Sequence, residues 1–434
     1  MIQNHAGVSV RRLTPQGREC FFGYYDKCPW NLGSARIIAG MTCVSGKLPE
    51  PDESLQVGYL EPGREGAFHP VGDTLAWNLQ QGAMAQWVTQ DGEEHILFNV
   101  REGDRAHARL VDTAGRVKGT LDQPVYALLP DGSLAASIDF GRLQRVRPGY
   151  GYAGVMTRHT EAMAPEEDGL WLVDLATGQS RLAVSYALLA EQVHPRGEDT
   201  PHWIDHIEFA PDGRWLVFLH RWIAADGGPL TRLMAMDLSA GSLTCLLDCG
   251  SAGHGLWLDD DHYGIWGRKG TLAAKARASS SSQGGLLRLG IRLARRLIPL
   301  RLKGRIHQES FLKLSPRYGT TEGILEQIPH GQRGGHPSLR PGGGWVVSDT
   351  LPDGGGRRLL FLAHLDGKAF IPLVTFTHDP ATANSAFRCD LHPRWDRTGR
   401  AVCVDSLHEG FRGMYEIEVP DAFTAGVRTL LQLD

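Results

Sequence analysis

The sequence lacks three features that would place it quickly in a common class. No uninterrupted apolar run is long enough to cross a membrane, and no apolar core follows the first residues as it does in a signal peptide. A net charge of −4 over 434 residues gives no general argument for nucleic-acid binding. The seven cysteines are irregularly spaced, which favours reduced thiols over a disulfide framework. We therefore expect a cytoplasmic protein that does not bind nucleic acid.

The sequence does contain a short motif that recurs along the chain. In four places the motif begins with a histidine, has an apolar residue three positions later, and ends in a turn of Pro, Asp or Gly type. The four histidines are His206, His254, His336 and His392. Looser copies begin at Lys27, Met84 and Val125. A self-similar unit of this length indicates a repeat architecture.

Most copies are followed by an apolar run, such as residues 215–219 or 401–404, and then by a further strand pattern. Runs of β-branched and aromatic residues between Asp and Gly turns predict short antiparallel strands. Units of about 40–50 residues with four such strands are propeller blades. We predict an all-β fold, a single seven-bladed β-propeller over 1–434. The alternative is a β protein of two domains.

Two intervals, 125–206 and 254–336, are too long for one blade and predict insertions. The second insertion covers 270–310 and opens with the linker-like composition of 279–285. From 286 to 306, leucines at helical spacing lie on one side and arginines on the other. This basic amphipathic helix predicts peripheral contact with an anionic membrane. The alternative is a lid that packs on the propeller.

Polar residues also follow the second strands of several units. In a propeller these loops share one face with the residues that lead the repeats. The residues concerned are Asp139, Arg142, His220, Arg221, Arg268, Asp349, Asp405 and His408. We expect this polar, largely cationic face to carry the function. The alternative is that individual side chains only tie neighbouring blades together by hydrogen bonds.

One part of this face has the chemistry of metal ligands. Cys389 and His392 lie three residues apart, and His336 leads the neighbouring unit. Asp349 and His408 are expected beside them. Thiolate, imidazole and carboxylate groups together suit Zn²⁺, so the sequence predicts a zinc site, with Mn²⁺ or Ca²⁺ as alternatives. The other interpretation of Cys389 is a buried thiol that packs as a small hydrophobe.

The chain resembles a known superfamily in five segments: 22–30, 77–87, 147–152, 218–222 and 388–395. They are similar to those of the seven-bladed propeller polysaccharide lyases, the oligogalacturonate lyases and, more closely, the ulvan lyases. The resemblance spans nearly all of the chain except 270–310. It implies cleavage of a uronate-containing oligosaccharide or polysaccharide by β-elimination.

The resemblance also implies roles for particular residues. Arg221 or Arg142 would grip the uronate carboxylate. His206 or His220 would remove the C5 proton, and Tyr150 or Tyr152 would protonate the leaving O4. Further substrate contacts are expected from Gln81, His254 and Arg268.

Two functions remain open at this point. The first is a metal-containing lyase that acts on an acidic glycan. The second is a non-catalytic glycan-binding propeller, held at the cytoplasmic membrane by the inserted helix and serving polysaccharide biosynthesis.

Overall fold

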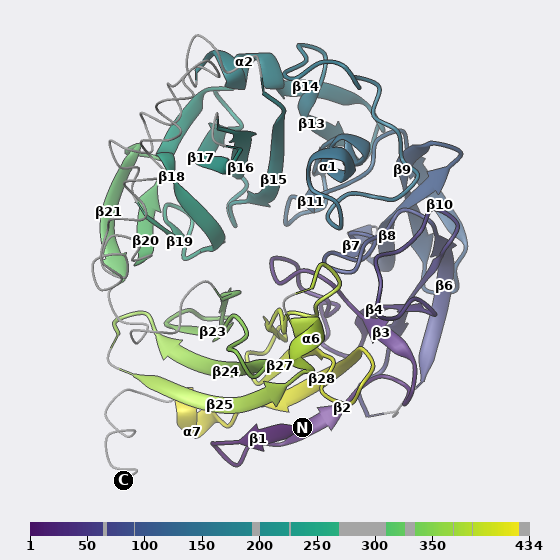
Figure 1. The fold of residues 1–434 in the computed structure, drawn as a ribbon, viewed down its shortest axis with the longest axis vertical. Coiled ribbons are helices and arrows are strands. Elements are labelled where there is room, and N and C mark those ends of the chain that lie inside the picture. The colour runs from purple at the N-terminus through teal and green to yellow at the C-terminus, as the bar shows by residue number, and fades with distance from the viewer. Residues whose placement is uncertain are drawn as a thin grey trace. The chain divides into compact units, whose positions relative to one another are not determined.

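The computed structural model describes residues 1–424 apart from 64–66, 91, 193–199, 225–226, 269–309, 326–334, 368 and 384. The predicted insertion of 270–310, with its amphipathic helix of 286–306, lies outside the described residues. In the part that is described, antiparallel strands dominate and the helices are short (Figure 1). No helix among these residues is long and apolar enough to cross a membrane.

The described strands form six hydrogen-bonded sheets, most of them built from four consecutive strands. The first is β3 (Glu19–Phe21), β4 (Ile37–Thr42), β5 (Leu55–Leu60) and β6 (Phe68–Thr74). The second is β7 (Gln86–Gln90), β8 (Glu93–Glu102), β9 (Arg105–Asp112) and β10 (Val117–Leu121). The third is β11 (Ala127–Leu128), β12 (Leu134–Ser137), β13 (Gly169–Asp174) and β14 (Ser180–Ser185). This regular succession is the one that the repeat predicts.

The largest sheet contains seven strands and divides at one of them. Its members are β15 (His202–Phe209), β16 (Trp215–Ile223), β17 (Pro229–Asp237), β18 (Leu243–Trp257), β19 (Tyr263–Arg268), β20 (Ser310–Ser315) and β21 (Thr320–Leu325). The first half of β18 pairs with β17, and its second half pairs with β19. The long strand therefore belongs to two successive four-stranded sheets, which brings the total among the described residues to seven.

The last two sheets contain strands from both ends of the chain. One is β22 (Ser338–Leu339), β23 (Trp345–Asp349), β24 (Arg357–His364) and β25 (Phe370–Thr377), extended by β1 (Ile2–Asn4). The other is β26 (Arg394–Trp395), β27 (Ala401–Ser406) and β28 (Gly413–Glu418), completed by β2 (Val10–Arg12). The short helices are α1 (Phe140–Val146), α2 (Tyr186–Glu191), α6 (Pro380–Ala383) and α7 (Asp421–Thr424).

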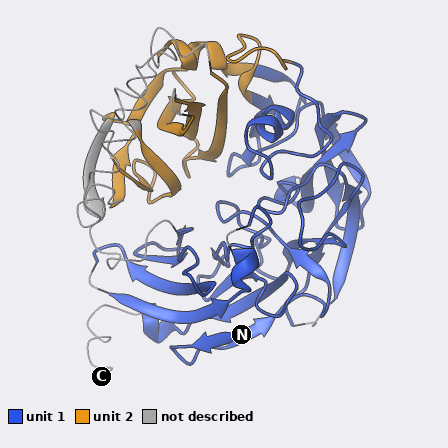
Figure 2. Ribbon diagram, viewed as in Figure 1, with its two compact units in different colours: residues 1–158, 172–181, 327–434 blue, residues 159–171, 182–326 orange. Residues whose placement is uncertain are grey.

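The chain divides into two compact units (Figure 2). The first comprises 1–158, 172–181 and 327–434, and the second comprises 159–171 and 182–326. Each unit has its own hydrophobic core. Trp30 and Trp77 belong to a core of the first unit, and Trp215 and Trp257 to that of the second. The single-domain assignment made from the sequence stays a prediction.

The turns of the repeat form as their residue types predict. In the two Pro-Asp-Gly turns, the side chains of Asp131 and Asp212 accept hydrogen bonds from the backbone N–H two residues later, both at 2.9 Å. Gly132 and Gly213, which follow them, have φ of 73° and 74°. Asp folds its side chain back onto the turn and Gly adopts positive φ without steric cost, so these sequences end one strand and begin the next.

Four of the seven residues that lead the repeat occupy equivalent places in the structure. Met84, Val125, His336 and His392 each lie two residues before the first strand of a sheet. His206 instead lies within β15, where the pairing register shifts. Among the described residues, four that are not glycine have positive φ, and three of them lead a repeat: Met84 at 52°, His206 at 53° and His392 at 43°. Three leading residues of the repeat thus have a strained backbone conformation. Such positions change the direction of side chains and are common at functional sites.

Candidate functional site

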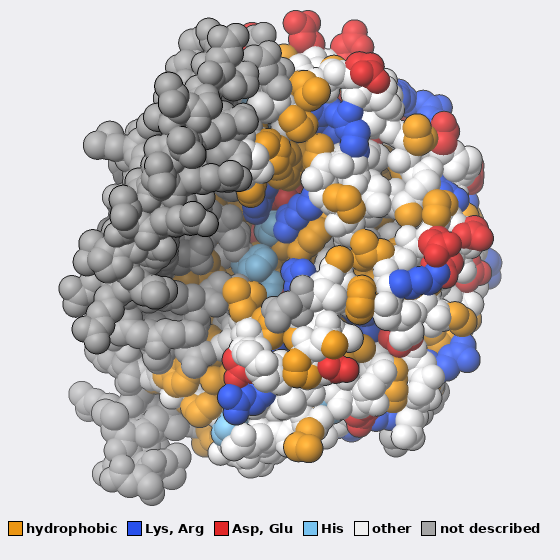
Figure 3. All heavy atoms as spheres, viewed as in Figure 1, with side chains coloured by type: hydrophobic (Ala, Val, Ile, Leu, Met, Phe, Trp, Pro, Cys, Tyr) orange, Lys and Arg blue, Asp and Glu red, His pale blue; other side chains and the backbone are white. Residues whose placement is uncertain are grey.

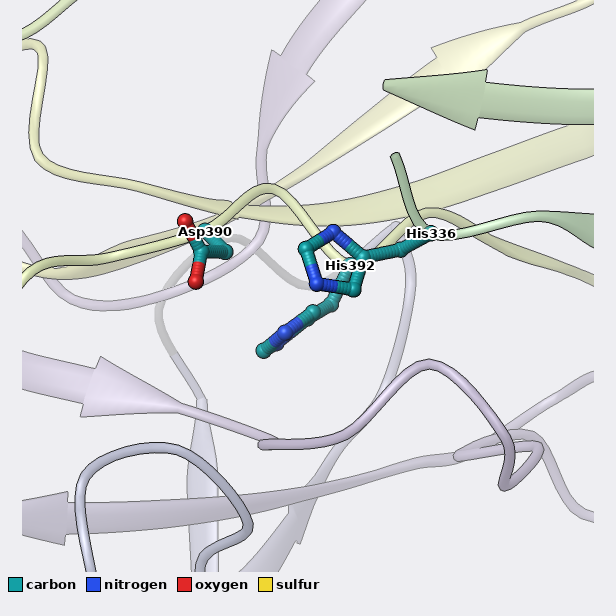
Figure 4. A group of neighbouring side chains, drawn as sticks. All are labelled: His336, Asp390 and His392. Atoms are coloured by element: carbon teal, nitrogen blue, oxygen red, sulfur yellow. The ribbon is translucent and has the colours of Figure 1, made fainter. Parts of the chain in front are cut away.

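Three buried side chains of the first unit form a group that could hold a metal ion (Figure 4). His336 lies just before β22, while Asp390 and His392 lie on the segment that leads into β26. One ligand atom from each residue lies within 4.8 Å of the other two. The imidazole rings of His336 and His392 meet edge to face, with centroids 4.3 Å apart. The sequence predicts both histidines as ligands but not Asp390.

Asp349, at the end of β23, sets the orientation of His336. Its buried carboxylate accepts a hydrogen bond from the backbone N–H of His336 at 2.7 Å, and the same oxygen lies 2.9 Å from the ring Nδ1. It also accepts the backbone N–H of Leu391 at 3.2 Å. A carboxylate that receives the Nδ1 proton leaves the lone pair on Nε2, the tautomer that binds metal ions. Asp349, predicted as a ligand, lies behind His336 and connects the two segments that carry the histidines.

His392 presents one ring nitrogen without a partner. The Nε2 atom is buried and makes no hydrogen bond in the part of the chain described, while the ring is also hydrogen-bonded to the backbone of Gly23. Burial, with a smaller contribution from His336, holds the pKa of His392 well below its usual value. The imidazole is therefore neutral at physiological pH, as metal coordination requires.

Asp390 contacts two guanidinium groups. Its Oδ1 lies 2.9 Å from Nη1 of the fully buried Arg358, and its Oδ2 lies 2.9 Å from Nε of Arg388. Arg358 also donates to the carbonyl of Ala383 at 3.0 Å. Two guanidinium groups facing one carboxylate make the surroundings of this group positive.

Two tyrosines, Tyr24 and Tyr25, pack against both histidines. The ring of Tyr24 lies 5.1 Å from that of His392, and the ring of Tyr25 lies 5.4 Å from that of His336. Burial raises the pKa of Tyr24 well above its usual value, with further contributions from neighbouring tyrosines. The hydroxyl of Tyr24 therefore stays protonated, and both rings cover the two histidines of the metal-binding group.

The backbone before these tyrosines requires a glycine. Gly23 has φ of 126°, and a Cβ built there would lie 2.6 Å from the backbone carbon of Gln81. Asp405 accepts the backbone N–H of Gly23 at 3.1 Å and forms a buried ion pair with Arg394 at 3.0 Å. Arg394 in turn donates to the carbonyl of Gly23 at 2.9 Å. This network fixes the segment that carries Tyr24.

The donor set fits a divalent metal ion. A buried nitrogen without a hydrogen bond, such as Nε2 of His392, costs free energy that an ion would offset. Two imidazoles and one carboxylate are ligands that Zn²⁺ and Mn²⁺ accept, whereas Ca²⁺ prefers oxygen alone. His336, His392 and Asp390 would hold the ion.

Two other predicted ligands lie outside this group. Cys389 is buried, its Sγ lies 3.7 Å from the carbonyl oxygen of Asp390, and burial raises the pKa of its thiol to about 12. The ligand atoms that come together are those of His336, Asp390 and His392, so the Cys389 thiol lies outside this group. His408 lies 3.0 Å from Ser406 Oγ, and burial lowers its pKa to about 4.

The two candidate tyrosine acids have different environments. Tyr152 is fully buried, stacks on Phe140 with centroids 4.2 Å apart, and accepts a hydrogen bond from Asn99 at 2.8 Å. Burial raises its pKa, so the hydroxyl is poorly suited to exchange a proton with substrate. Tyr150 instead accepts a hydrogen bond from Arg388 at 3.3 Å, beside the metal-binding group. Of the two, Tyr150 is the better candidate.

Gln81 and Arg142, predicted to contact substrate, are both buried in the first unit. The side chain of Gln81 donates to the hydroxyl of Tyr126 at 2.9 Å. Lys27, which leads the first repeat, has its Nζ 4.9 Å from the ring centre of the same tyrosine. Arg142 lies in α1 with no exposed surface, so a contact with substrate would require that helix to move.

In the second unit, three predicted residues lie together around an acid that the sequence analysis does not single out. Asp205 accepts a hydrogen bond from Arg221 Nε at 2.9 Å, and its Oδ1 lies 2.7 Å from Nδ1 of His206. The ring of His254 lies 5.6 Å from that of His206. An aspartate behind a histidine orients the ring and stabilises its protonated form, as a general base requires.

His220 and Arg268 lie elsewhere in the second unit. The Nε2 of His220 is 2.8 Å from Nδ1 of His202, and neither histidine is exposed. Burial holds the pKa of His220 well below its usual value. This pair is a less suitable base than His206. Arg268 ends β19, where it pairs with Ser251.

Histidine side chains are visible beside lysine or arginine side chains on the face drawn in Figure 3. The individual assignments of catalytic and substrate-binding residues stay predictions. Asp390 and Asp205 are the acids that the sequence analysis passes over. Each is adjacent to or two residues from a repeat histidine, which is the signal that could have found them.

No family model matches the sequence, and no curated protein sequence matches it. Among solved structures, the chain is similar to an oligogalacturonate lyase from Vibrio parahaemolyticus, with a TM-score of 0.60 and 13% identity over 98% of each chain. It is also similar to an oligogalacturonate lyase solved in complex with manganese, with a TM-score of 0.61 and 13% identity over 98% of this chain and 97% of the other.

These likenesses show the class of fold. The chain is an all-β protein with the fold of the seven-bladed β-propellers. The structures it matches over nearly their whole length are oligogalacturonate lyases, so the resemblance that the sequence indicates is confirmed for the fold. At 13% identity the activity does not follow from the fold.

Proposed function

We propose that this protein is a metal-dependent lyase that cleaves uronate-containing oligosaccharides by β-elimination. The observation that carries the proposal is the buried group of His336, Asp390 and His392, with an unpartnered Nε2 on His392 and the cation of Arg388 beside it. The likeness in fold to oligogalacturonate lyases, one of them bound to manganese, supports it.

A bound divalent ion would neutralise the uronate carboxylate and so make the C5 proton more acidic. A base then removes the C5 proton, the electrons of that bond form the C4–C5 double bond, and the C4–O4 bond breaks. An acid gives a proton to the departing O4. In the first unit, Tyr150 is the candidate for the acid, through its hydrogen bond with Arg388. In the second unit, His206, which Asp205 orients, stays the sequence-based candidate for the base.

The proposed metal ion is Zn²⁺ or Mn²⁺. Two nitrogens and one carboxylate suit Zn²⁺ or Mn²⁺, and the thiolate that would have favoured Zn²⁺ lies outside the group. The proposed substrate is an oligosaccharide of the cytoplasm rather than an intact secreted polymer.

The test is the formation of an unsaturated uronate from an oligogalacturonate, followed by ultraviolet absorbance and mass spectrometry of the products. Elimination leaves the summed product mass unchanged, whereas hydrolysis adds one water. His206→Ala should slow the reaction about 10²–10⁴-fold. His262→Ala, a change at a turn of the same unit, should leave the rate unchanged. Tight binding without any product would instead favour the non-catalytic glycan-binding function.

A further inference from the structure

We infer that Arg388 binds the carboxylate of the uronate substrate and makes the site select free acids over esters. This inference rests on the proposed function and names the residue that would set its substrate class. Arg221 and Arg142 are the sequence-based candidates for this role, but Arg142 is fully buried and Arg221 is held by Asp205.

The position of Arg388 on the chain places it beside the metal-binding group. It lies two residues before Asp390 and four before His392, on the same segment between α6 and β26. Its Nε lies 2.9 Å from Oδ2 of Asp390, and its Nη2 donates to the hydroxyl of Tyr150 at 3.3 Å. A ligand that reaches the metal-binding group therefore comes within reach of this guanidinium.

Exposure separates the two arginines that contact Asp390. The side chain of Arg358 is 0% exposed and that of Asp390 is 1% exposed, whereas that of Arg388 is 30% exposed. Arg358 is enclosed by protein and neutralises the carboxylate from within. Arg388 reaches the surface, and its Nη1 makes no hydrogen bond to the described residues, so this donor is available to a ligand.

The excess of positive charge near Asp390 favours the binding of an anion. Arg358 and Arg388 place two positive charges against the one carboxylate of Asp390. The guanidinium of Arg147 adds another cation, 3.5 Å from the ring centre of Tyr150. A planar carboxylate matches the fork of an arginine, and such charge-assisted hydrogen bonds are strong in a partly buried site. A methyl ester carries no charge and would lose most of this interaction.

The test measures binding without turnover. Isothermal titration calorimetry on the full-length protein, with a chelator present, compares a short oligogalacturonate with its methyl ester. The native protein should prefer the acid, and Arg388→Gln should weaken acid binding about 10- to 100-fold while ester binding changes little. Arg388→Lys, which keeps the charge but loses the fork, should give an intermediate affinity.

A matched control is Arg357→Gln, which removes an exposed guanidinium that pairs with Asp353 at 2.8 Å. It should bind both ligands as the native protein does, and melting temperatures confirm that each variant is folded. Equal affinity of the native protein for acid and ester, no binding of either, or an unchanged preference in Arg388→Gln would each overturn the inference. If the preference depends on Arg388 but no unsaturated product forms, the proposed lyase function fails while the carboxylate site stands.

Discussion

Asp349 accepts the backbone N–H of His336 at 2.7 Å, and the same carboxylate oxygen lies 2.9 Å from the ring Nδ1. One buried acid thereby fixes both the position and the tautomer of a histidine that faces Asp390 and His392. Hydrogen bonds of this kind behind a ligand usually raise its affinity for metal. The relationship gives the candidate site a preformed nitrogen ligand.

Replacement of Asp349 by Asn should weaken metal binding about 10- to 100-fold, because the amide cannot hold His336 in the same tautomer by charge. Titration with Mn²⁺ or Zn²⁺ measures the affinity. Asp353→Asn, in the turn between β23 and β24, is the control and should bind as the native protein does. Equal affinities in the two variants would mean that Asp349 does not support a metal ligand.

Asp390→Asn and Cys389→Ala should have opposite effects on metal content. The first removes a charged ligand and should lower the affinity at least about 10-fold, while the second changes a side chain that lies outside the group. Elemental analysis of folded protein distinguishes them. Loss of metal in Cys389→Ala with retention in Asp390→Asn would restore the thiolate site predicted from the sequence.

Gly23→Ala should destabilise the protein more than Gly46→Ala. Both residues have positive φ, at 126° and 67°, so both substitutions strain the backbone, typically by about 1–3 kcal/mol. A Cβ at Gly23 also meets the backbone of Gln81 at 2.6 Å, whereas nothing lies within 4 Å of one at Gly46. Urea unfolding monitored by fluorescence compares them. Equal losses of unfolding free energy in the two variants would show that the backbone near Gln81 can shift at little energetic cost.

Stability should fall as the pH drops below the ordinary pKa of histidine, in part because of His378. Burial, assisted by the charge of Arg358, lowers the pKa of His378 from 6.5 to about 3. The unfolded chain therefore binds a proton between these values that the folded chain does not. Stability is retained above pH 6.5 and falls by about 1.4 kcal/mol per pH unit towards pH 3.

His378→Gln should make this pH dependence shallower, and urea unfolding at several pH values measures the slope. His5→Gln, at an exposed position, serves as the comparison and should keep the native slope. If His378→Gln keeps the same slope of unfolding free energy against pH as the native protein, groups other than His378 cause the acid sensitivity.

The sequence analysis located the repeats because their chemistry is local. The Pro-Asp-Gly turns need only Asp131 or Asp212 and the glycine that follows, and four leading residues, Met84, Val125, His336 and His392, lie two residues before a strand. The metal-binding group depends on how the irregular segment before β26 directs its side chains, and His392 there has a φ of 43°. The sequence spacing pointed to Cys389 and did not reveal Asp390, because no regular period applies to such a segment.

The buried network around His336 could not have been predicted from spacing. Asp349 follows the second strand of its sheet, a place that indicates the functional face but not whether a carboxylate binds a metal or a neighbouring histidine. Arg358 reaches Asp390 from β24, a different part of the chain. Contacts of this kind depend on tertiary packing rather than on any local pattern.

The most direct test of the proposed activity is the rate of unsaturated uronate formation from an oligogalacturonate by the native protein and by a His336→Ala, His392→Ala double variant, each saturated with Mn²⁺. We expect ultraviolet absorbance to rise with the native protein, to stop on chelation, and to remain flat with the double variant, although both proteins are folded. An equal rise with both proteins, or no rise with the native protein at any divalent metal tested, would contradict a metal-dependent lyase at this site.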